Sequence, residues 1–303
     1  MRSIRVGTRG SELALVQARA ILNALDGEGE LIVIQTRGDR VVDRPLNRVG
    51  GAGLFIKEIE SALLDSRIDL AVHSMKDVPS EIAEGLTLAA TTKRIDPRDV
   101  LVSRRADSLA AIPPGARLAT GSLRRRSQLL AARPDLRVED LRGNVPTRLQ
   151  KFDASNWEAI VLAGAGLVRL GLAGRIRAFL PIEEMLPAVG QGALALEARA
   201  DDGELRERLD ALNDPDSSRA VASERAFLGR LEGGCQVPIG AYAEVSGNQL
   251  RLRGFVGSVD GTRTLKRAAA GRANAPYELG LALAEEMLSE GAADIVREVV
   301  PDP

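Results

Sequence analysis

The chain has 303 residues, of which 45% are hydrophobic and 27% are charged, so it can bury a substantial core and has the length of about two domains. Its single Cys and single His exclude an intrachain disulfide and a Cys/His zinc site, and this count fits a reducing compartment. No run of residues reaches the roughly 18 apolar positions of a membrane helix, and the first residues lack the apolar stretch of a signal peptide. We therefore expect a cytoplasmic protein with no membrane partner.

Charge is distributed unevenly along the chain. The formal net charge is only -1, yet the segment from Lys93 to Lys151 contains 14 basic and 6 acidic residues. Positive charge concentrated in one region attracts anions. Because only 3% of the residues are aromatic, stacking side chains for RNA are scarce, and we expect no nucleic-acid partner.

The first hundred residues are predicted to alternate between strands and helices. Apolar runs predict strands at 4–8, 31–36 and 68–72, and helical spacing predicts helices at 12–25 and 54–66. Ser11 is the expected N-cap of the first helix. This order is typical of a doubly wound sheet, so the fold class is α/β. The polar segment 36–53 is too long for an ordinary connection and is predicted as a lid or a disordered loop.

The same alternation begins again further along the chain. It predicts strands at 99–103, 117–120, 136–140 and 159–163, and helices at 123–132 and 145–152. The chain is expected to return to the first unit with a strand at 193–197. A helix at 217–231, strands at 237–245, 249–256 and 263–269 and a helix at 276–290 then predict a small α+β domain. The predicted domains are residues 1–92 with 193–213, residues 98–187, and residues 215–303.

Common nucleotide-binding motifs are absent. The segment GGAGLFIKE at 50–58 lacks the Gly-Lys-Ser/Thr of a phosphate-binding loop, and Gly164-Ala165-Gly166 lacks the third Gly of a dinucleotide motif. His73 and Ser74 are neighbours on a predicted strand, so their side chains point to opposite faces and cannot form a base and nucleophile pair. His73 is expected to be a strand-end histidine with a backbone partner.

Polar residues follow several of the predicted strands. Ser74, Lys76 and Asp77 lie just past the carboxyl end of a buried strand, where open α/β sheets place ligands, although the same residues could merely cap a helix or end the strand. At a second strand end and helix start lie Thr120, Ser122, Arg124 and Arg125. Orphan N–H groups and guanidinium forks at such a position suit carboxylates. Arg142 and Arg148 repeat the arrangement, and the alternative for each arginine is a solvated surface side chain.

Cys235 follows the pair Gly233-Gly234 and precedes a predicted strand. A lone Cys is more often a small buried hydrophobic residue. The glycine pair, however, leaves the backbone open, as an exposed and alkylatable thiolate requires.

Five segments, in this order, resemble the porphobilinogen deaminase family: HSMKDVPS, TGSLRRRSQL, LRGNVPTRL, AVGQGALALE and LEGGCQVPIG. The resemblance implies two lobes like those of periplasmic binding proteins with a cleft between them, a small C-terminal α+β domain, and a monomer. It also implies an enzyme that joins four porphobilinogens head to tail, with loss of ammonia, into hydroxymethylbilane. A dipyrromethane primer would be bound by a thioether to Cys235.

The resemblance also implies roles for individual residues. The cofactor carboxylates would be held by Ser74, Lys76, Thr120, Ser122, Arg124 and Arg125. The substrate carboxylates would be held by Arg9, Ser11, Arg142, Arg148, Arg169 and Gln191. Asp77 is expected to act as a carboxylate that stabilises the electron-poor azafulvene left after ammonia departs, and to move protons. No metal is expected.

One departure from the family pattern lies in the long loop. Many relatives have Lys within the glycine-rich turn, whereas this chain has Ala52. Arg48 could replace that contact, so Arg48→Ala is expected to lower turnover more than it alters cofactor loading, and equal activity would reject the idea. The alternative class is a non-catalytic, two-lobed protein that binds anions or polycarboxylates. Cys235 distinguishes the two classes, because such a protein needs no thioether.

Overall fold

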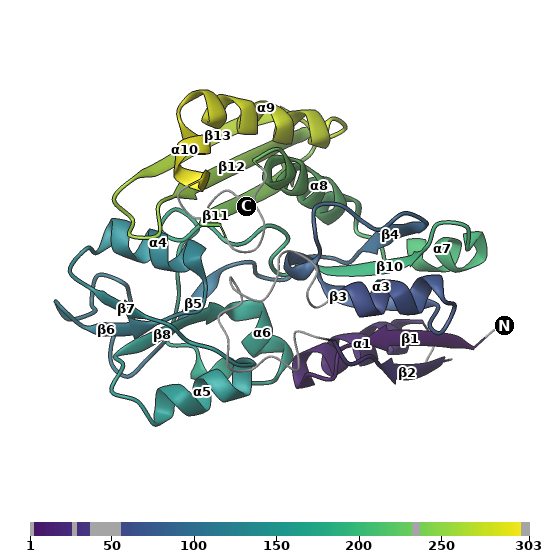
Figure 1. Cartoon of the computed structure of the whole chain (residues 1–303), viewed down its shortest axis with the longest axis horizontal. Coiled ribbons are helices and arrows are strands. Elements are labelled where there is room, and N and C mark those ends of the chain that lie inside the picture. The colour runs from purple at the N-terminus through teal and green to yellow at the C-terminus, as the bar shows by residue number, and fades with distance from the viewer. Residues whose placement is uncertain (1–2, 26–28, 37–55, 232–236, 298–303) are drawn as a thin grey trace. The chain divides into compact units, whose positions relative to one another are not determined.

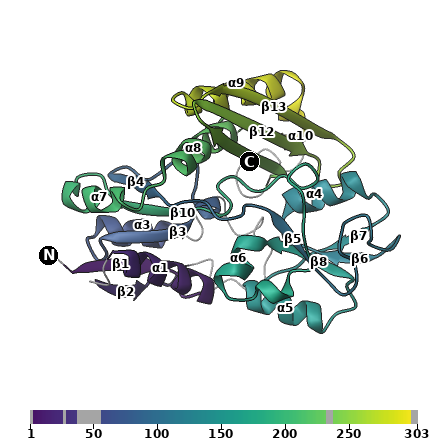
Figure 2. The same cartoon turned by 180° about the vertical axis from the view of Figure 1, so that it is seen from behind.

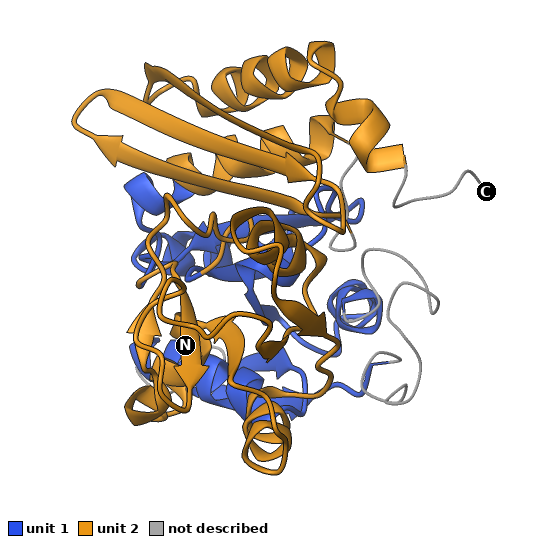
Figure 3. Ribbon diagram, turned by 90° about the vertical axis from the view of Figure 1, so that its left-hand side faces the viewer, with its two compact units in different colours: residues 1–95, 192–218 blue, residues 96–191, 219–303 orange. Residues whose placement is uncertain are grey.

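The computed structural model describes residues 3–25, 29–36, 56–231 and 237–297. The chain forms two compact units, which are coloured separately in Figure 3. The first contains residues 1–95 and 192–218, and the second contains residues 96–191 and 219–303. Within the described ranges no helix is both long enough and apolar enough to cross a membrane.

A five-stranded mixed sheet is the centre of the first unit (Figure 1). Its strands in spatial order are β2 (Gly29–Val33), β1 (Ile4–Thr8), β3 (Leu70–Ser74), β10 (Leu194–Arg199) and β4 (Leu86–Thr91). Strand β1 runs parallel to β2 and β3, whereas β10 is antiparallel to β3 and β4. The chain thus returns to this sheet after it has built the sheet of the second unit.

Helices cover both faces of the first sheet. They are α1 (Glu12–Ala24) and α7 (Gly203–Asp210) on one face and α3 (Lys57–Leu64) on the other. The core beneath α1 contains Val72 of β3, and the core beneath α3 contains Ala71. Because successive strand residues point to opposite faces, Ser74 lies on the α1 face and His73 on the α3 face.

The second unit contains another five-stranded mixed sheet. Its strands in spatial order are β7 (Arg137–Glu139), β6 (Arg117–Ala119), β8 (Ala159–Ala163), β5 (Asp99–Ser103) and β9 (Ala178–Phe179). One face is covered by α4 (Leu123–Ala132), and the other by α5 (Val145–Asp153) and α6 (Gly164–Arg169). A short 3-10 helix, η3 (Ala173–Arg175), follows α6.

The C-terminal part of the second unit is an antiparallel sheet with helices on one face. The strands β11 (Ile239–Ser246), β12 (Gln249–Gly257) and β13 (Thr264–Arg272) are adjacent in this order. The helices are α8 (Pro215–Arg230), α9 (Pro276–Ser289) and α10 (Ala292–Arg297) (Figure 2). Leu250 and Leu252 of β12 pack into the core beneath these helices, so Arg251 and Arg253 lie on the opposite face of the sheet.

The predicted α/β class with two sheet-based lobes and a small C-terminal α+β part is confirmed. Strands β1, β5 and β8 and helix α4 have the predicted bounds. Strand β3 begins and ends two residues later than predicted, because the N–H of buried Ile68 bonds the carbonyl of Ala62 at the end of α3. The three predicted domains stay a prediction, since residues 98–187 and most of 215–303 fall in one compact unit.

Several elements were not predicted from the sequence. They are β4, β9, α6, α7 and α10. Helix α7 shows why, because it is mostly charged and buries only Leu205 and Leu209. Two apolar residues one turn apart are too few to establish a helical period.

Candidate active site

A polar pocket of about 70 Å³ lies in the first unit at the carboxyl ends of β1 and β3. Its lining residues are Arg9, Ser11, Leu13, Ala14, Gln17, Ile56, Val72, His73, Ser74 and Asp77. The parallel strands β1 and β3 end at the same edge of the sheet, and the chain turns there into α1 and into a 3-10 helix, η2 (Met75–Asp77). The fold therefore brings the candidates Arg9, Ser11, Ser74 and Asp77 to one pocket.

The short helix η2 presents Asp77. Met75 is buried, and its N–H donates to the carbonyl of Ala193 at 3.1 Å, which continues the pairing of β3 with β10. The N–H of Val78 donates to the carbonyl of Met75 at 3.1 Å and closes the turn. Between these two anchors Lys76 is half-buried and Asp77 is exposed. Asp77 forms no ion pair with the described residues.

Helix α1 contributes two polar side chains to the pocket. The Oγ of Ser11 accepts from the N–H of Ala14 at 3.4 Å, so the predicted N-cap is confirmed. Gln17, buried on α1, donates from its amide to the Oγ of Ser74 at 2.9 Å. Sequence reasoning missed Gln17, although a polar residue among the apolar positions of the helix was an available signal.

His73 has a different partner from the one expected. Its Nε2 lies 2.9 Å from Oε2 of Glu197, and the two side chains are 4% and 0% exposed. The expected backbone partner is wrong, because β10 places Glu197 diagonally across the same face of the sheet. Glu60 of α3 lies near this pair, and its pKa is raised by burial and by the charge of Glu197. Oε1 of Glu197 is buried and has no hydrogen-bond partner among the described residues.

In the second unit two predicted arginines meet at a buried carboxylate. Asp99 accepts from Arg124 at 2.8 Å and from Arg125 at 2.9 Å, and all three side chains are at most 5% exposed. Burial alone would raise the pKa of Asp99, but the charges of the two guanidiniums outweigh burial and lower it. Burial, together with the charge of Arg125, lowers the pKa of Arg124.

Gln191 belongs to the same cluster. Its Nε2 donates to Oδ1 of Asp99 at 2.8 Å and to the carbonyl of Pro97 at 2.7 Å. Asp99, the first residue of β5, was not a predicted site residue. The sequence does show an acidic residue at the first position of an apolar strand, which could have marked Asp99. No nearby residue, however, identified the arginines that pair with it.

Thr120 and Ser122 lie at the start of α4. The Oγ of Ser122 accepts from the N–H of Arg125 at 3.4 Å and caps the helix. Thr120 is buried, and its Oγ1 accepts from the N–H of Ser122 at 3.3 Å. The sequence thus correctly placed both hydroxyls at a helix N-terminus.

The remaining arginine candidates lie around α5 and α6. Arg142 is half-buried before α5, and Arg148 on its second turn donates from Nε to the carbonyl of Gly143 at 2.7 Å. Asn144 caps α5 by accepting from the N–H of Thr147 at 2.9 Å. Arg169 ends α6, and burial lowers its pKa to about 10, so it is charged at neutral pH.

Some candidates cannot be placed. Cys235, Arg48 and Ala52 lie outside the described residues, as does most of segment 36–53. Within the described ranges no group of three His, Cys, Asp or Glu side chains could hold a metal ion.

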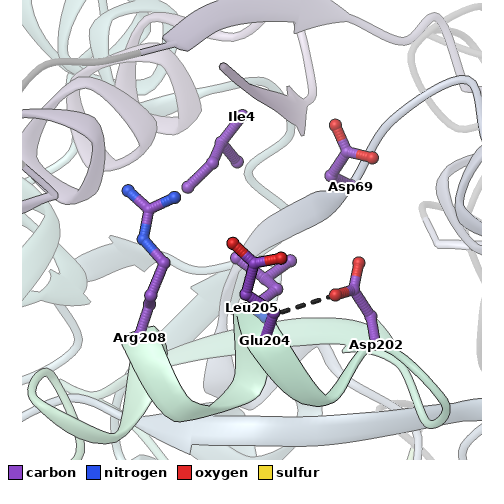
Figure 4. Close-up of a pocket in the computed structure, with 6 residues that line it drawn as sticks. All are labelled: Ile4, Asp69, Asp202, Glu204, Leu205 and Arg208. Atoms are coloured by element: carbon purple, nitrogen blue, oxygen red, sulfur yellow. Dashed lines mark hydrogen bonds between the residues drawn. The ribbon is translucent and has the colours of Figure 1, made fainter. Parts of the chain in front are cut away.

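A smaller pocket in the first unit serves packing. It has a volume of about 20 Å³ and is lined by Ile4, Asp69, Asp202, Glu204, Leu205 and Arg208 (Figure 4). Oδ1 of Asp202 accepts from the N–H of Leu205 at 3.2 Å and caps α7. Asp69 pairs with Arg5 at 2.8 Å and with Arg199 at 3.1 Å. The space suits about one water molecule and is too small for a substrate.

The fold and these residues define an α/β protein with clustered, partly buried cations at strand ends and helix starts. Two family models match the chain. The model described as "porphobilinogen deaminase, dipyromethane cofactor binding domain" matches residues 4–207. The model described as "porphobilinogen deaminase, C-terminal domain" matches residues 218–289. The chain belongs to the porphobilinogen deaminase family.

Curated relatives agree over nearly the full length. The porphobilinogen deaminase of Geobacter metallireducens is 50% identical, and the match covers 98% of this chain and 95% of that protein. The porphobilinogen deaminase of Brevibacillus brevis is also 50% identical, and the match covers 98% of this chain and 97% of that protein. Among solved structures, a periplasmic substrate-binding protein of an ABC transporter from Coxiella burnetii is 15% identical. That match covers 73% of this chain and 96% of the other chain, with a TM-score of 0.42.

Proposed function

We propose that the chain is a transferase of porphyrin and heme biosynthesis that joins four molecules of porphobilinogen head to tail into hydroxymethylbilane. Family membership over nearly the whole chain carries this proposal. In each addition a bond forms between the aminomethyl carbon of one porphobilinogen and a free ring carbon of the preceding pyrrole. The carbon–nitrogen bond breaks, and the proton lost from the ring carbon leaves with ammonia as ammonium. Water finally releases the product.

Asp77 is our candidate for the catalytic carboxylate. Loss of ammonia leaves positive charge on a pyrrole ring, and a fixed carboxylate beside that ring lowers the energy of the cation. Two backbone hydrogen bonds hold η2, and Asp77 remains exposed at the pocket. Its carboxylate can therefore accept a pyrrole N–H and take part in moving the ring proton.

The family cofactor is dipyrromethane, which when bound supplies the free ring carbon that the first substrate joins. In our proposal Cys235 holds it by a thioether, and its carboxylates are bound by Ser74, Lys76, Thr120, Ser122, Arg124 and Arg125. The Asp99 cluster fits this role, because two guanidiniums share one carboxylate and the cluster carries excess positive charge. Nε of Arg125 is buried without a hydrogen-bond partner among the described residues. An external carboxylate supplies both a counter-charge and an acceptor.

The substrate carboxylates are assigned to a second set of cations and polar groups. They are Arg9, Ser11, Arg142, Arg148, Arg169 and Gln191. Each pyrrole carries an acetate and a propionate, so a growing chain needs many such groups. Desolvation lowers the pKa of Arg169, and a bound carboxylate offsets that cost by pairing with the guanidinium.

We further propose that the chain acts as a cytoplasmic monomer without a nucleic-acid partner. The most exposed large hydrophobic side chains of the described ranges are Val33, Leu64, Val168 and Tyr277. They belong to four different elements, β2, α3, α6 and α9. Single exposed apolar residues on separate elements are normal on the surface of a monomer, which supports this proposal.

The rival function is a non-catalytic protein that binds polycarboxylates. Family membership argues against it, because porphobilinogen deaminase family models match residues 4–207 and 218–289. An anionic ligand that needs no catalysis gains nothing from the exposed carboxylate of Asp77 in the pocket. A cation formed during the reaction, by contrast, requires such a group.

Intact mass measured on the purified protein and on Cys235→Ser tests the function. We expect the native protein to exceed its sequence mass by two porphobilinogens less two ammonias, to colour with a pyrrole-reactive aldehyde, and to release ammonium and hydroxymethylbilane from porphobilinogen. Cys235→Ser should show neither the extra mass nor the colour. A native protein that carries no adduct, even after incubation with porphobilinogen, would favour the rival function.

A further inference from the structure

The second unit carries an open pocket of about 520 Å³ on its C-terminal sheet. Arg251, Arg253 and Lys266 line it from β12 and β13, and Ile182, Glu183 and Leu186 line it from the segment before β10. Register pairs Arg253 with Ala268 and Phe255 with Lys266, so these side chains share the face that α8 and α9 leave uncovered. The volume lies in the range of small-molecule sites, about 300–1,000 Å³.

Cations outnumber acids in this pocket. Arg253 pairs with Glu183 at 2.7 Å and with Glu244 at 3.0 Å. Arg251 and Lys266 are exposed, and neither forms an ion pair with the described residues. Register places Arg251 opposite Glu244, so the three cations exceed the two carboxylates by one positive charge. The exposed side chains of Arg251 and Lys266 are the groups that can each pair with a carboxylate of a ligand.

The walls of the pocket are held in place by internal contacts. The N–H of Leu186 donates to Oε1 of Gln128 at 2.8 Å, and Nε2 of Gln128 donates to the carbonyl of Leu186 at 3.0 Å. Two carboxylates fix Arg253 from different elements. A wall that is ordered before binding costs little entropy when the ligand arrives.

Apolar surface lies beside these charges. Ile182 is half-buried and Leu186 is buried, and both line the pocket. A flat ring can pack on this surface while its carboxylates reach Arg251 and Lys266.

We propose that this pocket binds a small polycarboxylate built on an aromatic or pyrrole-type ring. The pocket shares no residue with the catalytic or carboxylate-binding residues assigned above. The proposal stands apart from the reaction, because it concerns equilibrium binding to the C-terminal sheet.

Calorimetric titration of the full-length holoenzyme with benzene-1,3,5-tricarboxylate tests the proposal. We expect Arg251→Glu and Lys266→Glu each to weaken binding at least tenfold, since each replaces an attractive contact by a repulsive one. Arg137→Glu is the matched control, because Arg137 is an exposed arginine on an edge strand of the other sheet of this unit. The affinity of the Arg137→Glu variant for the tricarboxylate should stay within twofold of that of the parent protein.

Two comparisons complete the experiment. An aliphatic tricarboxylate should bind at least fivefold more weakly than the aromatic one, because it has no ring to pack on Ile182 and Leu186. Turnover of porphobilinogen by Arg251→Glu and Lys266→Glu should match the parent, which separates this pocket from the active site. No binding at millimolar tricarboxylate, equal affinity of all variants, or equal affinity for both ligands would overturn the proposal.

Discussion

Asp99 and Glu197 are fully buried carboxylates, and each pairs with side chains that are distant in the sequence. Asp99 balances one of two guanidiniums, while Glu197 contacts the imidazole of His73. Removing one partner from a buried pair leaves a polar or charged group without compensation, so single substitutions there have large effects. These carboxylates hold the groups around them in fixed positions.

Asp77→Asn should lower the turnover of porphobilinogen about 100- to 1,000-fold, because the amide cannot stabilise a cation electrostatically. The substrate KM should change little, since the arginines that we propose as ligands of the substrate carboxylates remain. Steady-state release of ammonium measures both constants, and intact mass shows whether the cofactor is loaded. Asp107→Asn, at an exposed aspartate of the second unit, should stay within twofold of the parent. Parent-like turnover in loaded Asp77→Asn would refute the assigned role.

Glu197→Gln should lower the free energy of unfolding by about 1–2 kcal/mol, because a neutral amide replaces the buried carboxylate that contacts Nε2 of His73. Urea denaturation followed by circular dichroism measures the loss. Glu207→Gln, at an exposed position on α7, should change the stability by less than about 0.5 kcal/mol. If His73→Gln, Glu197→Gln and the double variant show additive losses, the two side chains do not act as a pair.

Helices α8 and α9 approach each other closely at a glycine of α9. A Cβ on Gly280 would overlap the carbonyl oxygen of Ser223 and lie 2.7 Å from the Cβ of Ala226. Both neighbours belong to α8, and the first is backbone, so it cannot rotate away. The absence of a side chain at Gly280 is therefore what allows the two helices to pack over the C-terminal sheet.

Gly280→Ala should destabilise the protein by about 1–3 kcal/mol, because the added methyl overpacks the contact between α8 and α9. The sign of the stability change is informative, because alanine in an unhindered helix is favoured over glycine by about 1 kcal/mol. Gly203→Ala is the control, because a Cβ at the start of α7 meets nothing within 4 Å. Thermal unfolding of both variants gives the comparison, and a stabilised Gly280→Ala would contradict the packing argument.

Over the whole molecule, charge is segregated along the sequence. Residues 93–151 carry 14 basic and 6 acidic side chains in a chain of net charge -1. Most of this segment lies in the second unit, which contains the cluster of Asp99, Arg124 and Arg125. Carboxylated substrates are therefore attracted by a field that covers more than the atoms they touch.

The KM for porphobilinogen should rise several-fold between about 10 mM and about 1 M sodium chloride, because the screening length falls from about 30 Å to about 3 Å. The kcat should change less than twofold, since the groups that contact the reacting ring are at short range. Initial rates at each salt concentration, with matched viscosity, give both constants. A KM independent of salt would show that the segregated charge does not assist substrate binding.

Local sequence patterns predicted much of the fold. The apolar runs of β1, β5 and β8 and the spacing of α4 set the bounds of these elements correctly, and Ser11 was identified as a cap. These signals act within a few residues, where backbone hydrogen bonds and side-chain periodicity are decided. Helix α7 and strand β4 were missed, because α7 buries only Leu205 and Leu209 and the burial of β4 does not alternate from residue to residue.

The sequence by itself determined the α/β class, the polar strand ends that carry Asp77 and Arg124, and the excess of positive charge in residues 93–151. Only the tertiary structure decided which groups meet: Gln17 with Ser74, His73 with Glu197 124 positions away, and Arg124 with Asp99 25 positions away. The physical reason is that strand register and helix packing bring such residues together. Both depend on how whole elements exclude water from a shared core, which local spacing does not encode.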